Sequence, residues 1–163
     1  MVAAPLLLGL LLLLGVANGS PVVAAKLLKQ RFDVPLDGGR KLPDGKPVFG
    51  FSKTIRGLVV SMCFTVIVAL LLGFEWSVGV AVSAGAMAGD LCSSFVKRRL
   101  RLEPHTQSFG LDQLPEALLP LLLLQDRLGL SWWDITVLLV AFLALQIGLS
   151  RLLFLLGIRD RPY

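Results

Sequence analysis

Hydrophobic residues in this chain come in long blocks separated by short polar stretches, unlike the alternating pattern of a soluble helix or strand. A block of about 18 or more apolar residues is typical of a transmembrane helix. Such blocks predict five spans, at about residues 5–28, 57–74, 77–96, 114–130 and 133–157. We therefore predict an all-α integral membrane protein with five transmembrane helices, which forms a single domain over residues 1–163.

The composition supports this fold class, because 55% of the residues are hydrophobic and the mean hydropathy is +0.78. In the first span, residues 18–21 (NGSP) interrupt the apolar run, which is compatible with a straight, a kinked or a partly unwound helix. A cleaved signal peptide would begin with basic residues, and none of the first 25 residues is basic. We therefore expect the first span to stay in the protein.

The net charge of +5 would suggest nucleic-acid binding in a soluble protein, but in a membrane protein it reflects basic cytoplasmic loops. Eight of the 16 Lys and Arg residues lie in residues 26–56 and four in residues 97–101, whereas the loops on the opposite side hold only Arg127. This pattern predicts a multi-pass cell-membrane protein without a nucleic-acid partner, its amino terminus outside and its carboxyl terminus cytoplasmic. The cytoplasmic loops would be residues 29–56 and 97–113. Three tryptophans mark the predicted outer interface, Trp76, Trp132 and Trp133.

The segment GDLCSSFVKRRL, residues 89–100, places polar side chains at the end of a run of small and apolar residues. Helical spacing puts them on one face, which consists of Asp90, Ser93, Ser94, Lys97 and Arg98. A charge inside a membrane costs at least about 2.5–3.5 kcal/mol, so it normally faces a polar cavity or a partner. Asp90 could therefore belong to a functional site or form a structural ion pair with Lys53, Arg56 or Lys97.

The segment GFSKTIRGL, residues 50–58, opens the second span with two cations and a hydroxyl, on Lys53, Arg56 and Thr54. A helix amino terminus attracts anions, and the added cations make phosphate the natural ligand. The alternative is a polybasic anchor for lipid head groups. The preceding stretch PLDGGRKLPDGKPVFG is rich in Pro and Gly, which suggests an ordered loop, and its Lys46 is a further candidate for phosphate binding.

The segment LDQLPEALLP, residues 111–120, opens the fourth span with two acids four residues apart, Asp112 and Glu116. One interpretation is helix capping, with Asp112 as the N-cap and Pro115 in the first turn. The other is that Asp112, Asp90 and Glu116 converge on Mg²⁺, which proteins usually hold with one or two carboxylates, water and substrate phosphates. The sequence leaves both interpretations open.

Taken in chain order, the segments PLDGGRKLPDGKPVFGFSKTIRGL, GDLCSSFVKRRL and LDQLPEALLP together resemble those of the CDP-archaeol synthases, the archaeal branch of the phosphatidate cytidylyltransferase superfamily. The resemblance extends from about residue 30 through the fifth span. The resemblance implies a Mg²⁺-dependent enzyme of archaeal phospholipid biosynthesis. Such an enzyme joins CTP to the membrane lipid 2,3-bis-(O-geranylgeranyl)-sn-glycerol 1-phosphate and gives CDP-unsaturated archaeol and pyrophosphate. The family's K-T-x-R-G, G-D-x-x-[SG]-S-F-x-K-R and L-D-Q-L stretches correspond here to Lys53, Thr54 and Arg56, to Asp90, Ser93, Ser94, Lys97 and Arg98, and to Asp112.

The chain departs from the bacterial members of that superfamily, which tend to read S-x-x-K-R-x-x-x-x-K-D and later L-D-R-x-D. Glu103–Pro104 takes the place of the K-D pair, Gln113 that of the Arg, and Pro115 that of the second Asp. The second metal ligand is therefore open, and Asp90 or Glu116 would have to supply it.

The charges suggest a mechanism. A phosphomonoester has a second pKa of about 6, so it is largely dianionic at pH 7 and needs no general base to act as a nucleophile. We expect in-line attack on the α-phosphorus of CTP, with Asp90, Asp112 and Lys97 as the catalytic groups. The alternative function is a small transporter or channel subunit that uses Asp90, although polar residues cluster at one end of the spans. Faces of small residues on the third span could serve contacts within the chain or a homodimer.

Overall fold

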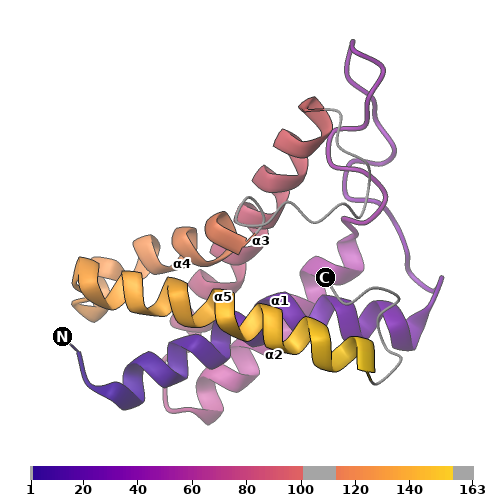
Figure 1. The fold of residues 1–163 in the computed structure, drawn as a ribbon. Helices are drawn as coiled ribbons and strands as arrows, with labels where there is room; N and C mark the ends of the chain where they lie inside the picture. The colour runs from indigo at the N-terminus through magenta and orange to yellow at the C-terminus, as the bar shows by residue number, and fades with distance from the viewer. Residues whose placement is uncertain (1, 101–112, 156–163) are drawn as a thin grey trace.

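The computed structural model describes residues 2–100 and 113–155, and these residues form an all-helical fold. Five α-helices follow one another: α1 (Ala4–Leu28), α2 (Ile55–Leu71), α3 (Trp76–Arg99), α4 (Gln113–Leu128) and α5 (Trp132–Leu155) (Figure 1). Each corresponds to one of the predicted spans, which confirms the all-α prediction for the described residues.

The helix ends differ from the predicted ones for local reasons. Helix α2 begins two residues earlier than predicted, at Ile55, because Thr54 is its N-cap and accepts a hydrogen bond from the Gly57 N–H at 3.2 Å. Helix α3 continues to Arg99, because a basic last turn stabilises the negative end of the helix dipole. The predicted end of the fifth span, at residue 157, lies outside the described residues.

Helix α1 passes through residues 18–21 without interruption, although Pro21 lies inside it. Proline has no N–H, so it cannot donate to the carbonyl of Ala17 one turn earlier. The Ser61 hydroxyl of α2 donates to that carbonyl at 2.8 Å and also shares a hydrogen bond with Ser83 of α3 at 2.9 Å. The Ala17 carbonyl, which Pro21 leaves without a donor in α1, therefore accepts its hydrogen bond from the neighbouring helix α2.

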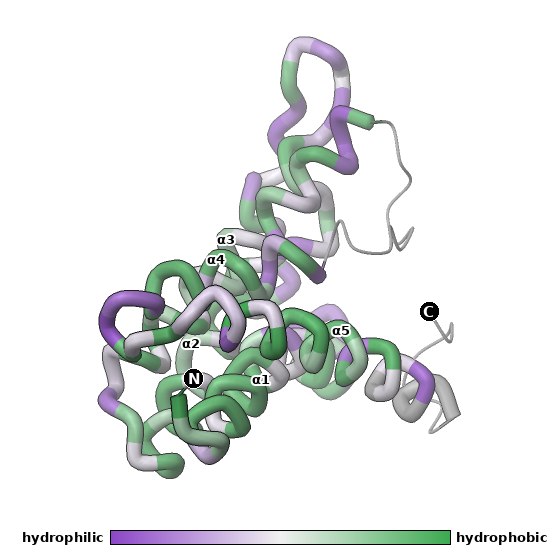
Figure 2. Tube along the Cα trace, turned by 60° about the vertical axis from the view of Figure 1, so that its left-hand side comes forward, coloured by the Kyte–Doolittle hydropathy of each residue, from purple (hydrophilic) through white to green (hydrophobic). Residues whose placement is uncertain are grey.

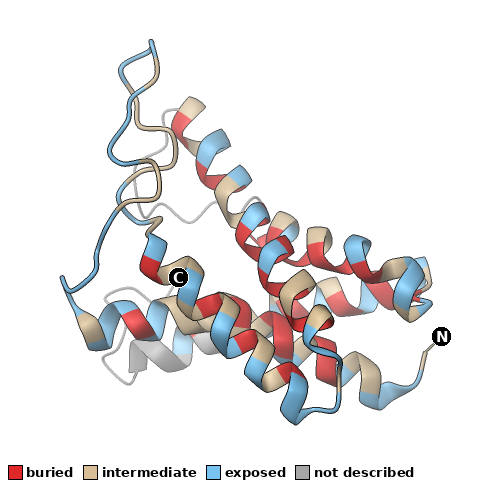
Figure 3. Ribbon diagram, turned by 180° about the vertical axis from the view of Figure 1, so that it is seen from behind, coloured by how far each residue is buried: buried red, intermediate tan, exposed pale blue. Residues whose placement is uncertain are grey.

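The core lies where α3 crosses the other helices. Helix α3 packs against α1, α2 and α4, while α5 packs against α1 and α4. Figure 3 shows the buried residues concentrated at these crossings. The largest fully buried apolar side chains are Leu10, Leu13, Leu14, Leu121, Leu124, Ile135, Leu138 and Phe142.

Two glycines allow α3 and α4 to approach closely. A Cβ atom at Gly85 would lie 2.7 Å from the Pro120 Cα, and one at Gly89 would overlap the Pro115 carbonyl. Any larger residue at either position would collide with the backbone of α4, as expected at small-residue helix contacts in membranes. This contact fixes the start of α4 beside the Asp90 turn of α3.

The helices of the bundle consist mainly of hydrophobic residues (Figure 2). Helices α1 and α3 are long and apolar enough to cross a membrane, by length and composition, while α2 and the Trp132–Gly148 part of α5 form shorter apolar stretches. Large hydrophobic side chains are exposed on the outside of the bundle, among them Leu8, Leu12, Phe64, Leu71, Leu123 and Val140. In a soluble monomer so large an apolar surface would be exceptional.

The chain between α1 and α2, residues 29–54, projects from the bundle alongside the last turns of α3 (Figures 1 and 2). None of its residues is buried, in contrast to the helices (Figure 3). We call residues 29–54 the α1–α2 loop. This loop contains no β-strand, only isolated β-bridges between Pro35 and Thr54 and between Lys41 and Pro47.

Candidate active site

The α1–α2 loop is organised around the carboxylate of Asp37. This side chain accepts backbone N–H groups of Gly39 at 3.0 Å, Phe49 at 3.0 Å and Gly50 at 3.1 Å. Partial burial raises the pKa of the Asp37 carboxyl, but these hydrogen bonds outweigh it and leave the pKa below its ordinary value. The loop is therefore ordered, as its composition predicts, by an ionised carboxylate that joins its two halves.

Backbone pairing fixes the end of the loop that leads into α2. The Leu36 N–H donates to the Lys53 carbonyl at 2.7 Å, and the Ile55 N–H donates to the Val34 carbonyl at 3.0 Å. These bonds hold Lys53 and Thr54 next to the start of the helix. Two of the predicted phosphate ligands are thus placed by main-chain geometry.

Lys53 meets Asp90 across the boundary between loop and bundle. The Lys53 Nζ lies 2.5 Å from both carboxylate oxygens of Asp90. Both side chains are about one-fifth exposed, at 21% and 23%, so the pair is accessible from solvent. The structure thereby unites the 50–58 and 89–100 segments, and Lys53 is the partner that Asp90 takes among the three candidates.

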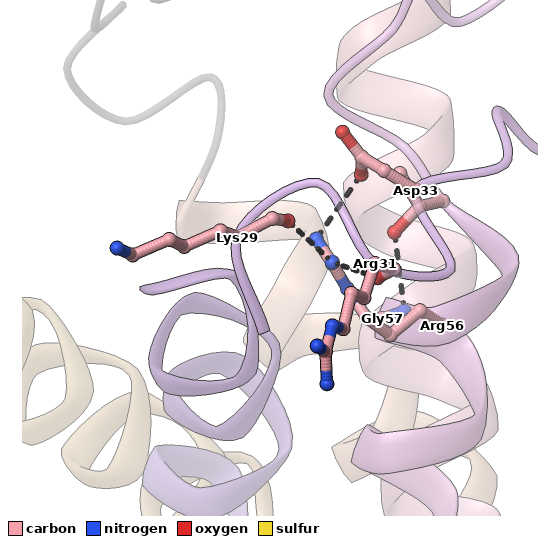
Figure 4. Close-up of polar contacts among 6 residues, drawn as sticks. Lys29, Arg31, Asp33, Arg56 and Gly57 are labelled. Atoms are coloured by element: carbon pink, nitrogen blue, oxygen red, sulfur yellow. Dashed lines mark hydrogen bonds and ion pairs between the residues drawn. The ribbon is translucent and has the colours of Figure 1, made fainter. Parts of the chain in front are cut away.

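Arg56 points to the beginning of the loop (Figure 4). Its guanidinium donates to the carbonyls of Lys29 at 2.8 Å and Arg31 at 2.6 Å, and forms an ion pair with Asp33 at 3.1 Å. Arg56 is also buried. These contacts hold the junction between α1 and the loop, and the predicted phosphate contact of Arg56 remains a prediction.

The predicted polar face of α3 continues from Asp90 toward the end of the helix. Ser93 is buried and donates to the Gly89 carbonyl at 2.9 Å, and Ser94 is buried as well. Arg98 is buried beside the loop, where its Nε would lie 3.9 Å from a Cβ atom at Gly50. Lys97 is partly exposed. Their roles toward phosphate remain predictions.

The start of α4 completes the surroundings of Asp90. Close packing at Gly89 brings the Glu116 backbone against α3, and the Glu116 side chain is buried. Asp112, the other predicted carboxylate, lies outside the described residues. Within residues 2–100 and 113–155, no three acidic, histidine or cysteine side chains gather as a metal site. Of the three predicted metal ligands, the structure therefore describes two, Asp90 and Glu116.

Sequence reasoning did not select three residues that shape this region, Asp37, Asp44 and Arg99. Arg99 binds the Asp44 carboxylate and donates to the Pro47 carbonyl at 2.7 Å. The signal that could have identified the acids is the pattern D-G, which occurs in PLDGG and LPDGK and marks turns whose carboxylate binds nearby N–H groups. No local pattern indicated the partner of Arg99.

The fold and the site together define a helical membrane protein with a charged site at the polar end of its bundle. A sequence profile of the CarS-like family, CDP-archaeol synthase, matches residues 74–163. The CDP-archaeol synthase of Sulfolobus acidocaldarius is 36% identical over 97% of this chain and 98% of its own length. That of Thermofilum pendens is 36% identical over 91% of this chain and 76% of its own.

A solved structure gives the same result. It belongs to an intramembrane enzyme for archaeal membrane lipid biosynthesis, with a TM-score of 0.70 and 33% identity over 87% of this chain and 90% of that one. The chain belongs to the CDP-archaeol synthase family, as its three segments suggest.

Proposed function

We propose that this chain is a CTP-dependent cytidylyltransferase that converts CTP and 2,3-bis-(O-geranylgeranyl)-sn-glycerol 1-phosphate to CDP-unsaturated archaeol and pyrophosphate. The observation that carries the proposal is the contact between Lys53 and Asp90. It joins two family segments, 37 residues apart, at the border between the apolar bundle and the polar loop. A lipid phosphate is held at such a border, where a soluble nucleotide can reach it.

The main obstacle to the reaction is repulsion between phosphates. Two unit negative charges about 4 Å apart repel by roughly 4 kcal/mol at an effective dielectric constant of 20, and the two substrates bring several such charges. Cations on the loop, at the start of α2 and on α3 would bind the phosphate oxygens, namely Lys46, Lys53, Arg56, Lys97 and Arg98. Thr54, Ser93 and Ser94 would donate hydrogen bonds. Catalysis then consists mainly of charge neutralisation and alignment.

The carboxylate of Asp90 suits a divalent cation. It already holds a positive group, the Lys53 ammonium, on both oxygens, and oxygen ligands are those that Mg²⁺ prefers. Asp90 would hold Mg²⁺, with Asp112 and Glu116 as the further candidates. When bound, the ion supplies positive charge to the phosphate oxygens. Lys53 would then be released from Asp90 and could bind a phosphate.

The protein contributes to the chemical step mainly by positioning the two substrates. The lipid phosphate is largely dianionic at neutral pH and attacks the α-phosphorus of CTP. A bond forms between the lipid phosphate oxygen and this phosphorus, and the bond to the pyrophosphate oxygen breaks. Lys97 lies two turns beyond Asp90 on the same face of α3 and would stabilise the charge that develops on the phosphates.

The proposed setting is the cell membrane, crossed by five helices, with the site on the cytoplasmic side. Support comes from the distribution of residues at the two ends of the bundle. Trp76, Trp132 and Trp133 are exposed at the starts of α3 and α5. Arg127, from the end of α4, bonds to Ser77 at 2.8 Å and so ties these ends together. The basic α1–α2 loop lies beside the opposite end of α3, the end that the positive-inside rule assigns to the cytoplasm.

The test is turnover by the purified protein with labelled CTP, Mg²⁺ and the ether-lipid phosphate, followed as pyrophosphate release. We expect Asp90→Asn and Asp112→Asn each to lower kcat at least about 10²–10³-fold, since each removes a carboxylate that would hold the Mg²⁺ ion needed to neutralise the phosphates. Asp126→Asn, at an exposed acid of α4, is the matched control and should retain activity. Full activity of either site variant would remove that residue from the mechanism, and an inactive wild type would refute the proposed function.

A further inference from the structure

We infer that Arg99 is a positioning residue that holds the tip of the α1–α2 loop against α3 and thereby places Lys46 for binding the phosphates of CTP. The tip, residues 40–48, is called the hairpin below. The inference rests on the proposed function, in which Lys46 and Lys53 bind the nucleotide. It adds a residue that contacts the hairpin rather than the substrate.

Arg99 contacts the hairpin through two residues on either side of Lys46. One guanidinium nitrogen binds the carboxylate of Asp44, and another donates to the Pro47 carbonyl at 2.7 Å. These two residues flank Lys46, whose own N–H donates to the Asp44 carboxylate at 3.1 Å. The position of Lys46 relative to α3 is therefore set directly by the residues that Arg99 holds.

The guanidinium is itself fixed by α3. Its central carbon lies 5.3 Å from the centre of the Phe95 ring, one helical turn earlier. Such stacking leaves the edge of the planar group free for two hydrogen bonds, which a lysine ammonium cannot reproduce. Phe95 and Arg99 thus form a second stripe on α3, separate from the face that carries Asp90 and Lys97.

The hairpin is stiff enough to transmit this constraint. The Leu42 N–H donates to the Lys46 carbonyl at 2.9 Å, and the Val48 N–H donates to the Arg40 carbonyl at 3.2 Å. These bonds join the two sides of the hairpin, so a contact at Asp44 also restrains Lys46.

Among the described residues, two ion pairs attach the loop to α3, and together they restrain the orientation of the loop more than either pair would alone. The first is the pair of Lys53 and Asp90, and the second is Arg99, nine residues further along α3. At 1.5 Å per residue the two points are about 13 Å apart. With Arg99 removed, the loop stays attached at Lys53 but Lys46 can move away from the site. The expected consequence is weaker binding of CTP with an unchanged chemical step.

The experiment compares Arg99→Gln and Arg99→Lys with Arg40→Gln, whose side chain is exposed on the same hairpin. Steady-state kinetics of the purified protein are measured with CTP varied at saturating lipid phosphate, and then with the lipid varied. We expect Arg99→Gln to raise KM for CTP about five- to tenfold, with kcat within about twofold and KM for the lipid unchanged. Arg99→Lys should show a similar increase, and Arg40→Gln none.

A second experiment measures how accessible the hairpin is to a protease. Cleavage of the Lys41–Leu42 bond by endoproteinase Lys-C should be faster in Arg99→Gln than in the wild type and in Arg40→Gln. Asp44→Asn removes the same ion pair from the loop side and should reproduce both effects, which also covers the case that Arg99→Gln does not fold. The double variant should be no worse than Arg99→Gln alone.

Three results would overturn the inference. The first is an unchanged KM for CTP in a folded Arg99→Gln or Asp44→Asn protein. The second is a fall in kcat with KM unchanged, because it would assign Arg99 to the chemical step. The third is equal cleavage of the hairpin in all variants. Absence of turnover by the wild type would instead refute the proposed function and, with it, this dependent inference.

Discussion

The helical bundle and the α1–α2 loop are held together by different forces. Every buried apolar residue among those described lies in a helix or in the α4–α5 turn. The backbone of α3 leaves no room for a Cβ atom beside its neighbours at Gly79, Gly85 and Gly89. The loop has no buried residue and is held by charged groups, namely Asp37, Arg56, Asp44 with Arg99, and Lys53 with Asp90.

This difference explains where a site for charged substrates can form. A bundle packed through apolar and small residues is rigid but has few charged side chains, whereas a loop held by charges has many of them but little apolar packing of its own. Asp90 lies where the two meet, because α3 belongs to both regions. The difference also predicts that the bundle is sensitive to volume and the loop to charge, and three changes test this.

The largest expected effect comes from adding one methyl group to the bundle, in Gly89→Ala. The new Cβ would overlap the Pro115 carbonyl, so α3 and α4 would have to separate. We expect a loss of about 2–3 kcal/mol in the free energy of unfolding, the usual cost of overpacking a tight contact. Thermal unfolding in detergent measures the loss. Turnover should fall too, because Glu116 and the start of α4 would move from Asp90.

The matched control is Gly148→Ala in α5, where a Cβ would meet no atom within 4 Å. Alanine is the better helix former by up to about 1 kcal/mol, so this variant should be as stable as the wild type or more stable. If Gly89→Ala also melted at the wild-type temperature, small-residue contact would not be what holds α3 to α4.

The bundle is the region that the sequence predicted well. Apolar blocks gave all five helices, since the period and length of such blocks depend only on local sequence. The small residues before Asp90 indicated close packing, and helical spacing identified the polar face of α3. The convergence of Lys53 and Asp90 could also be anticipated, because both stand at the polar ends of spans on the same predicted side.

The loop was less predictable, for a physical reason. Its contacts join residues far apart in the chain, such as Asp44 and Arg99, which are 55 positions apart. No periodicity records such a pairing. Arg56 illustrates the limit: its place at a helix start suggested an anion, whereas in the structure it binds two carbonyls and Asp33. A cation at a helix amino terminus can serve either partner, and only the path of the chain decides.

An intermediate effect is expected at the buried hydrogen bond between the Ser61 hydroxyl of α2 and the Ala17 carbonyl of α1. Ser61→Ala removes the donor from the Ala17 carbonyl, which Pro21 leaves without a helical partner. An unsatisfied buried carbonyl costs about 1–2 kcal/mol, so the free energy of unfolding should fall by this amount. Thermal unfolding again provides the measurement.

The double variant isolates the cause. Pro21→Ala restores an N–H to α1 that can bond to the Ala17 carbonyl, so Ser61→Ala should cost less in the Pro21→Ala background than in the wild type. An equal cost in both backgrounds would assign the loss to the hydrogen bond between Ser61 and Ser83 instead.

The smallest effect should be the pH dependence of the loop. Hydrogen bonds from Phe49, Gly50 and Gly39 hold the pKa of Asp37 below its ordinary value. Asp37 therefore stabilises the folded loop above the ordinary pKa of about 3.9, and this contribution is lost as the pH falls through the lower pKa of the folded state. Hydrogen–deuterium exchange, corrected for intrinsic rates, should show protection of residues 37–50 decreasing about three- to tenfold below that range.

The variant Asp37→Asn separates the effect of charge from that of hydrogen bonding, because an amide keeps one acceptor oxygen but no charge. Its loop should already be less protected at pH 7 and should change little with acid, while Asp126→Asn, an exposed acid of α4, should follow the wild type. Protection of the bundle amides should not change over the same pH range, since volume rather than charge holds that region. Wild-type loop protection that stays constant down to pH 3 would show that the charge of Asp37 does not stabilise the loop. The proposed difference between a bundle held by packing and a loop held by charge would then be wrong.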